Sequence, residues 1–172
     1  MDALDRTATA RSSAVAQAIG LAAWLALTAV AAAAGAIASV DAQAFYAQLD
    51  KPAWAPPPSV FGPVWSLLYF LMAVAAWRVW RARPAQRVDG ALGLYVVQLV
   101  ANALWSWLFF GWHQGALAFG EVLLLLALIA ATVAAFWRIR PAAGLLLLPY
   151  LAWVCFASAL TWSVWQRNPG LL

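Results

Sequence analysis

The feature that most constrains this chain is a succession of five long apolar segments separated by short polar ones. A helix needs about 20 mostly apolar residues to cross the hydrocarbon of a bilayer, and each segment reaches that length. Soluble domains have roughly 25% charged residues, whereas this chain of 172 residues has 9% charged and 66% hydrophobic ones. The pattern predicts an all-α membrane protein, one domain over residues 1–172 built as a five-helix transmembrane bundle. The expected spans are residues 15–40, 61–80, 91–110, 116–137 and 144–165.

The basic residues predict how this bundle is oriented. Of the ten lysines and arginines, eight fall on one side of the predicted topology and two on the other. Because cytoplasmic loops carry an excess of Lys and Arg, we expect the N-terminus in the cytoplasm and the C-terminus outside. The first apolar run is too long for a signal-peptide core, so we expect it to be retained as a helix. The eight are Arg6, Arg11, Arg78, Arg81, Arg83, Arg87, Arg138 and Arg140, and the two are Lys51 and Arg167.

The first connection, residues 41–59, is rich in proline and charge. It is too long and too polar for a tight turn, so we expect a structured loop outside the membrane.

Groups that would support hydrolytic, metal or nucleotide chemistry are sparse. The sequence has no phosphate-binding glycine loop, no His/Cys metal cluster and no Ser-His-Asp set. The one histidine, His113, falls in a predicted turn, and the one cysteine, Cys155, is expected to be a small buried residue. The net charge of +4 is spread over loops and forms no nucleic-acid patch. We therefore expect no metal, no cofactor and no nucleic-acid partner.

A single carboxylate, Glu121, falls inside a predicted span. Two interpretations stay open for it. It is either an interfacial carboxylate favoured by the positive end of its helix, or a polar group at the rim of a pocket. One such group does not make the relay of charges that an ion pump needs.

The positive signal is aromatic, because the chain has 12 tryptophans. Trp65 and Tyr69 are four residues apart on one helical face, and Gln98, Asn102 and Trp105 share another. Unsatisfied amides are costly in hydrocarbon, so Gln98 and Asn102 must face the protein interior, where they bond between helices or reach a ligand. Indole and phenol rings with a few amides suit a planar apolar ligand with polar edges, such as a sterol or a tetrapyrrole.

Five blocks of sequence resemble the TspO/MBR family, the bacterial tryptophan-rich sensory proteins and mitochondrial translocator proteins. They are KPAWAPP at 51–57, FGPVWSLLY at 61–69, GLYVVQLVANALW at 93–105, FFG at 109–111 and PYLAWVCFA at 149–157. The blocks keep the order of the family and span about residues 45–168, which makes the resemblance specific.

The resemblance implies a bundle, often dimeric, in a bacterial inner (cytoplasmic) membrane, which binds porphyrins, sterols and benzodiazepine-type drugs between its helices. It implies a lid in the first loop. Some members degrade protoporphyrin IX in light, an activity that would fall to Trp65 and Trp153 here. Leu117 stands where some relatives have an aromatic wall residue. The pocket residues carried over are Trp65, Tyr69, Gln98, Asn102, Trp105, Leu117, Trp153, Ala157 and Leu160, and the lid residues are Trp54, Pro56 and Pro57.

The sequence departs from the family at its cholesterol motif. Trp162 stands where the motif has tyrosine, and Thr161 stands where asparagine is usual. Such motifs are weak even when intact, so we rank sterols below porphyrins as ligands. The expected function is a membrane receptor or sensor for tetrapyrroles, with a light-dependent porphyrin oxidase and a porphyrin or sterol transporter as alternatives.

Gly93, Val97 and Ala101 form a stripe of small side chains at four-residue spacing. Small residues let helices approach closely in lipid, so the stripe either packs inside one bundle or joins two protomers. We expect a homodimer.

Overall fold

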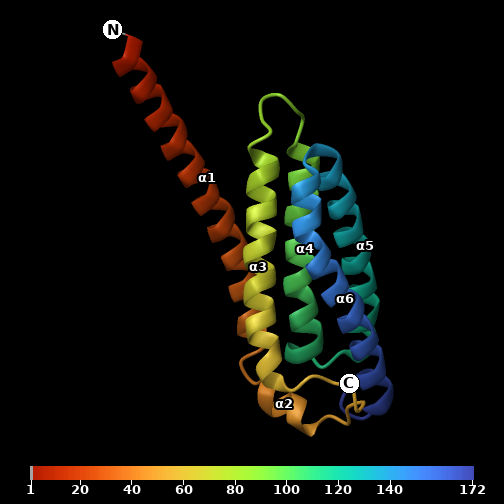
Figure 1. Ribbon diagram of the computed structural model, residues 1–172. Coiled ribbons are helices and arrows are strands. Elements are labelled where there is room, and N and C mark those ends of the chain that lie inside the picture. Colours follow the sequence, from red (N-terminus) through yellow and green to blue (C-terminus); the bar gives the residue numbers. More distant parts are fainter. Residues whose placement is uncertain (1) are drawn as a thin grey trace.

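The computed structural model describes the backbone of residues 2–172 and the side chains from residue 14 onward. It is a bundle of long helices that run up and down beside one another (Figure 1). Within the described residues, five segments are long and apolar enough to cross a membrane, which confirms the predicted class. The elements are α1 (Asp2–Ala38), α2 (Ala42–Gln48), α3 (Pro58–Trp80), α4 (Asp89–Ser106), η1 (Trp107–Gly111), α5 (Gly115–Ile139) and α6 (Pro141–Arg167).

The predicted spans match the helices in their centres and differ at their ends. The helix α1 begins at Asp2 rather than near residue 15, although only Ala14–Ala38 is apolar enough to span. The segment 41–59 is not wholly a loop, because it contains the seven-residue helix α2. The last helix begins at Pro141 rather than at residue 144, because proline lacks only an N–H that the first turn leaves unpaired anyway.

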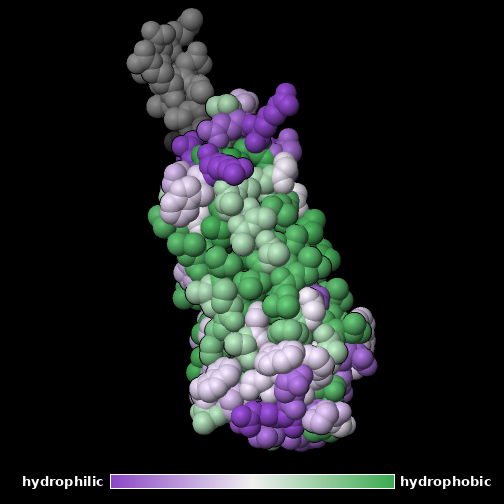
Figure 2. All heavy atoms as spheres, turned by 90° about the vertical axis from the view of Figure 1, so that its right-hand side faces the viewer, coloured by the Kyte–Doolittle hydropathy of each residue, from purple (hydrophilic) through white to green (hydrophobic). Residues whose placement is uncertain are grey.

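The two ends of the bundle differ in charge and in construction. One end, here called the arginine end, carries the α3–α4 connection with Arg81, Arg83 and Arg87, and the junction of α5 and α6 at Arg140. The opposite end, the loop end, carries α2, the segment 49–57 and the C-terminus (Figure 1). A hydrophobic band separates two hydrophilic ends on the face shown in Figure 2, as expected of a protein that lies in a bilayer.

The helices α5 and α6 are joined by a single extended residue, Arg140, with φ −147° and ψ 101°. Their backbones approach closely next to this junction. A Cβ atom added to Gly144 would lie 2.8 Å from the ring of Trp137 and 3.1 Å from its Cα, so only glycine fits there. The two helices are therefore held tightly together at the arginine end.

The interior has two apolar clusters with different surroundings. The larger one includes the fully buried Met72, Val79, Tyr95 and Phe136 and fills the bundle toward the arginine end. The smaller one lies at the loop end, where Phe45 of α2 packs on Phe109 of η1 and Tyr46 of α2 packs on Phe61 of α3. Its buried members are Tyr46, Leu49, Phe109, Ala118, Leu160 and Val164.

Candidate binding cavity

A cavity of about 670 Å³ lies inside the bundle, in the half nearer the loop end. All five spanning segments contribute to its wall, and α2 contributes Tyr46 from the loop end. Ligand pockets for small molecules commonly have volumes of about 300–1,000 Å³ and mostly apolar walls. The cavity therefore has the size and the lining of a ligand site.

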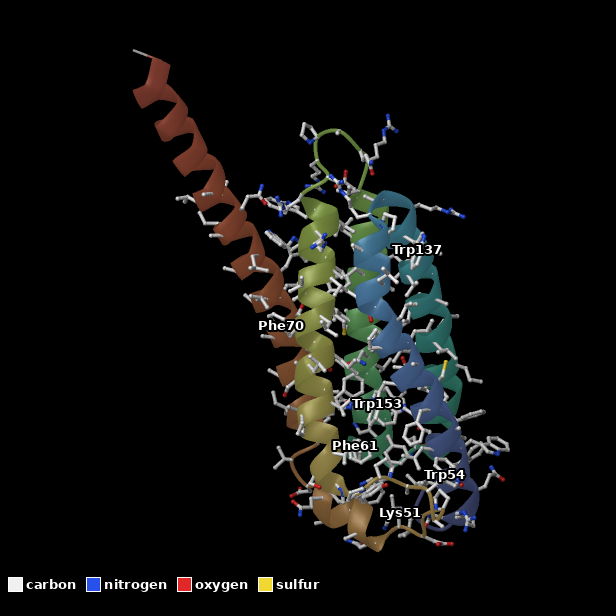
Figure 3. The ribbon with its side chains drawn as sticks, in the orientation of Figure 1. Lys51, Trp54, Phe61, Phe70, Trp137 and Trp153 are labelled. Atoms are coloured by element: carbon white, nitrogen blue, oxygen red, sulfur yellow. The ribbon has the colours of Figure 1, made fainter. Side chains whose placement is uncertain are left out.

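Aromatic rings form much of the cavity wall. Trp65 and Tyr69 follow each other on α3 with ring centroids 5.4 Å apart. Trp153 of α6 meets Phe61 of α3 edge to face at 6.0 Å, and Figure 3 shows these two side chains next to each other within the bundle. Trp105 of α4 completes the set. Flat faces and edges of this kind suit a planar aromatic ligand, since offset and edge-to-face ring pairs are both favourable.

A chain of hydrogen bonds runs from the cavity wall into the core. The Tyr69 hydroxyl donates to Asn102 Oδ1 at 2.6 Å, and Asn102 Nδ2 donates to the Tyr150 hydroxyl at 3.1 Å. The Tyr150 hydroxyl in turn donates to Gln98 Oε1 at 2.9 Å. Tyr69 and Asn102 line the cavity, whereas Tyr150 and Gln98 are buried behind them. The chain supplies polar groups to a wall that also includes the polar residues Ser39, Gln43, Ser59, Ser106 and Thr161.

At the loop end, the cavity is lined by Ala42, Gln43 and Tyr46 of α2, and residues 49–57 follow without lining it. We call α2 together with residues 49–57 the lid segment. Tyr46 of α2 lines the cavity, and its hydroxyl donates to the carbonyl oxygen of Pro56 at 3.3 Å. Burial raises the pKa of the Tyr46 phenol, which therefore stays protonated at neutral pH. Lys51 Nζ donates to two carbonyl oxygens, those of Tyr46 and Leu49. Trp54 packs edge to face on Phe156 of α6 at 5.7 Å.

Asn168, the residue after the last helix, holds the lid segment against α6. Its Oδ1 accepts from the Asp50 backbone N–H at 2.8 Å, and its Nδ2 donates to the Asp50 carbonyl at 2.9 Å. Nδ2 also donates to the carbonyl of Val164 at 2.7 Å, which caps α6. An exposed ion pair between Arg167 and Asp50, at 3.6 Å, lies beside this contact.

The structure brings most of the predicted pocket residues together and leaves two outside. Gln98 is 1% exposed and lies behind Tyr150 instead of on the wall. Leu117 is 59% exposed on the outer surface of α5, so its expected place in the wall is wrong. The predicted residues that line the cavity are Trp65, Tyr69, Asn102, Trp105, Trp153, Ala157 and Leu160. The predicted lid residues Trp54, Pro56 and Pro57 belong to the lid segment but do not touch the cavity.

Two other residues differ from their predicted surroundings. Glu121 is only 9% exposed, neither of its carboxylate oxygens has a hydrogen-bond partner among the described residues, and it does not line the cavity. Cys155 is exposed on the outside of α6 rather than buried. His113 is exposed in its turn, as predicted, and stacks on Phe45 at 4.0 Å. Among the described residues, no group of three or more His, Cys, Asp or Glu side chains could hold a metal ion.

Sequence reasoning missed four residues that shape the site. Phe61 and Tyr46 line the cavity, Tyr150 links the polar chain, and Asn168 anchors the lid segment. Asn168 carried a usable signal, because asparagine directly after an apolar helix is a common capping residue. Its pairing with Asp50, 118 residues earlier, carried none.

The stripe expected to join two protomers is only partly on the surface. Gly93 and Val97 are exposed on α4, whereas Ala101 is packed in the core. The exposed ridge of α4 continues instead through Val100 and Leu104.

Comparison with known proteins gives one consistent family. The model of the TspO/MBR family matches residues 17–166. Human translocator protein is 41% identical over 128 residues, which cover 73% of this chain and 76% of that protein. The protein CrtK of Rhodobacter capsulatus is 41% identical over 144 residues, covering 83% and 88% respectively. The tryptophan-rich sensory protein of Cereibacter sphaeroides is 39% identical over 124 residues, covering 72% and 77%.

Proposed function

The chain belongs to the TspO/MBR family of membrane proteins, and we propose that it is a receptor that binds tetrapyrroles and similar planar apolar ligands in its cavity. Two of its relatives are named translocator protein and tryptophan-rich sensory protein, and these names describe the relatives. For this chain the proposal rests on the wall of the cavity.

The observation that carries the proposal is that four aromatic side chains line one cavity together with the hydrogen-bonded pair of Tyr69 and Asn102. Trp65, Trp105 and Trp153 come from three different helices and line one cavity together with Tyr69. Indole rings provide large flat contact areas, and each aromatic pair contributes about 0.5–1.5 kcal/mol beyond its burial. Tyr69 and Asn102 supply the few polar contacts that a pocket of this kind needs to orient a ligand.

The charge distribution supports an orientation in the membrane. Six arginines with described side chains lie at the arginine end, and Lys51 and Arg167 lie at the loop end. The side chains of Arg6 and Arg11 are outside the described residues. By the positive-inside rule the arginine end faces the cytoplasm of a bacterial inner membrane. In that orientation the lid segment and the nearby cavity face outward.

Fluorescence quenching by protoporphyrin IX, measured in the dark on detergent-solubilised protein, tests the proposal. We expect saturable quenching in the low micromolar range. Trp65→Phe and Trp153→Phe should each weaken binding by about 2- to 13-fold, as expected for the loss of one favourable ring contact. Trp137→Phe is the matched control, because Trp137 is an exposed tryptophan at the arginine end, away from the cavity.

Linear, unsaturable quenching would mean that the porphyrin only partitions into micelles. Equal affinities of Trp65→Phe, Trp153→Phe and Trp137→Phe would place the binding site elsewhere. Either result would overturn the proposal.

A second candidate function, light-dependent breakdown of protoporphyrin IX, is favoured by one observation. Trp65 and Trp153, whose indoles are redox-active, both line the cavity. Illumination of the complex should then produce a new absorbing species in the wild type and not in the double variant Trp65→Phe/Trp153→Phe. Equal bleaching of the pigment with both proteins would eliminate this candidate.

A further inference from the structure

The hydrogen-bond chain Gln98–Tyr150–Asn102–Tyr69 can reverse its direction of donation as a whole. Both of its amides have an NH₂ group that donates and a carbonyl oxygen that accepts, and both of its hydroxyls can donate and accept. The three contacts measure 2.6, 3.1 and 2.9 Å, which suit donation in either direction. The chain can therefore run two ways without moving its backbone.

In the direction described above, every donor points toward Gln98. The hydrogen of the Tyr69 hydroxyl is committed to Asn102, so Tyr69 offers the cavity only its oxygen lone pairs. In the opposite direction both amides are rotated by half a turn, Gln98 Nε2 donates to Tyr150, and Tyr150 donates to Asn102. Asn102 Nδ2 then donates to Tyr69, whose own hydrogen is free to point into the cavity.

We propose that Gln98, although it does not touch the cavity, is a positioning residue that lets Tyr69 act toward a ligand as acceptor or as donor. The inference rests on the proposed binding function and deepens it. The site would accept planar apolar ligands with either a donor or an acceptor at the edge. A residue at position 98 that cannot both donate and accept a hydrogen bond would restrict Tyr69 to one of these two roles.

Gln98→Met nearly keeps the side-chain volume but leaves only one favourable direction for the hydrogen-bond chain. Without Gln98 Oε1, the Tyr150 hydrogen keeps a partner only if it turns to Asn102 Oδ1. A buried donor left unpaired is costly, so the variant favours the direction in which the Tyr69 hydroxyl donates to the cavity. Ligands that only accept should gain relative to ligands that only donate.

Carbazole and acridine are a suitable pair of probes, because both are planar tricyclic molecules of similar size. Carbazole has one N–H donor, and acridine has one nitrogen acceptor and is neutral at pH 8. Gln98→Met should shift the ratio of their affinities about 2- to 13-fold toward acridine, the effect of one net hydrogen bond. Energy transfer from tryptophan to the probe measures the binding.

Two controls separate positioning from general damage. Thr132→Val removes a buried hydroxyl that bonds only to the carbonyl of Leu128, so it should leave the ratio unchanged. In a Tyr69→Phe background, Gln98→Met should no longer shift the ratio. An unchanged ratio in Gln98→Met, or the same shift without Tyr69, would overturn the inference.

A measurement without ligand distinguishes failure of this inference from failure of the proposed function. The chain has four tyrosines, so their ¹³Cζ signals can be assigned by four Tyr→Phe variants. Gln98→Met should move the Tyr69 signal to higher field, as its hydroxyl changes from donor to acceptor toward Asn102, and Thr132→Val should not. An unmoved Tyr69 signal refutes the reversal even if protoporphyrin binds, whereas a moved signal supports it even if protoporphyrin does not.

Discussion

Replacement of Asn168 by alanine is the sharpest test of what holds the lid segment against α6. The Asn168 side chain makes two hydrogen bonds to the lid segment, both to the backbone of Asp50. A net hydrogen bond contributes about 0.5–1.5 kcal/mol, so the two together hold the lid segment by about 1–3 kcal/mol. Their loss should increase the open population about 5- to 150-fold, since each 1.4 kcal/mol is a factor of ten.

Hydrogen–deuterium exchange of residues 49–57 measures this population directly. We expect faster exchange in Asn168→Ala at these residues, and faster dissociation of a bound porphyrin by a similar factor. Exchange within α3 and α4 should stay unchanged, because Asn168 makes no hydrogen bond to either helix among the described contacts.

Arg167→Ala is the matched control for this variant. It removes a neighbouring contact to the same residue, Asp50, but an exposed ion pair is worth only about 0–1 kcal/mol. It should therefore change exchange by no more than about fivefold. If both variants have the same effect, or if Asn168→Ala leaves exchange at residues 49–57 unaltered, the side chain does not hold the lid segment and the reasoning is refuted.

Three further predictions concern packing, burial and association. Gly115→Ala should lower the thermal midpoint at a cost of about 1–3 kcal/mol, because an indole carbon lies 2.5 Å from the added Cβ. Gly120→Ala, with open space around it inside the same helix, should not lower the midpoint, because alanine favours a helix more than glycine does. Equal midpoints of the two variants would disprove the crowding. Glu121→Leu should raise the midpoint, since it removes two buried, unpartnered oxygens worth about 1–3 kcal/mol; a lower midpoint would reveal a partner for the carboxylate. Val97→Cys in a Cys155→Ala background should cross-link two protomers if the exposed ridge of α4 is the dimer interface, and a purely monomeric band would exclude that interface.

The sequence predicts the spans well because hydropathy over 20 residues is a strong signal that depends on the bilayer alone. It also places Asn102 correctly, since an amide in a membrane helix has to face other protein groups. The same argument puts Gln98 in the interior, but it cannot tell the cavity wall from the layer behind it. That distinction depends on Tyr150, which belongs to another helix.

Apolar residues are where sequence reasoning fails, and α5 shows why. Leucine and alanine occupy both buried and exposed positions of this helix, so for these residues the residue type does not distinguish the lipid face from the core face. Leu117 and Leu125 are the same residue type, yet Leu117 lies on the outer surface and Leu125 lines the cavity. The short helix α2 was missed for a different reason, because seven residues between polar segments give too short a pattern to distinguish a helix from a loop.

The close packing of α5 against α6 has a consequence for how a ligand enters. At the arginine end a Cβ on Gly144 would meet Trp137, and at the loop end a Cβ on Gly115 would meet Trp165. Phe119 of α5 also packs on Trp162 and Trp165 of α6, with ring centroids 4.8 and 6.0 Å apart. Because the two helices are in close contact at both ends, we expect ligand entry to depend on displacement of the lid segment and not on separation of α5 from α6.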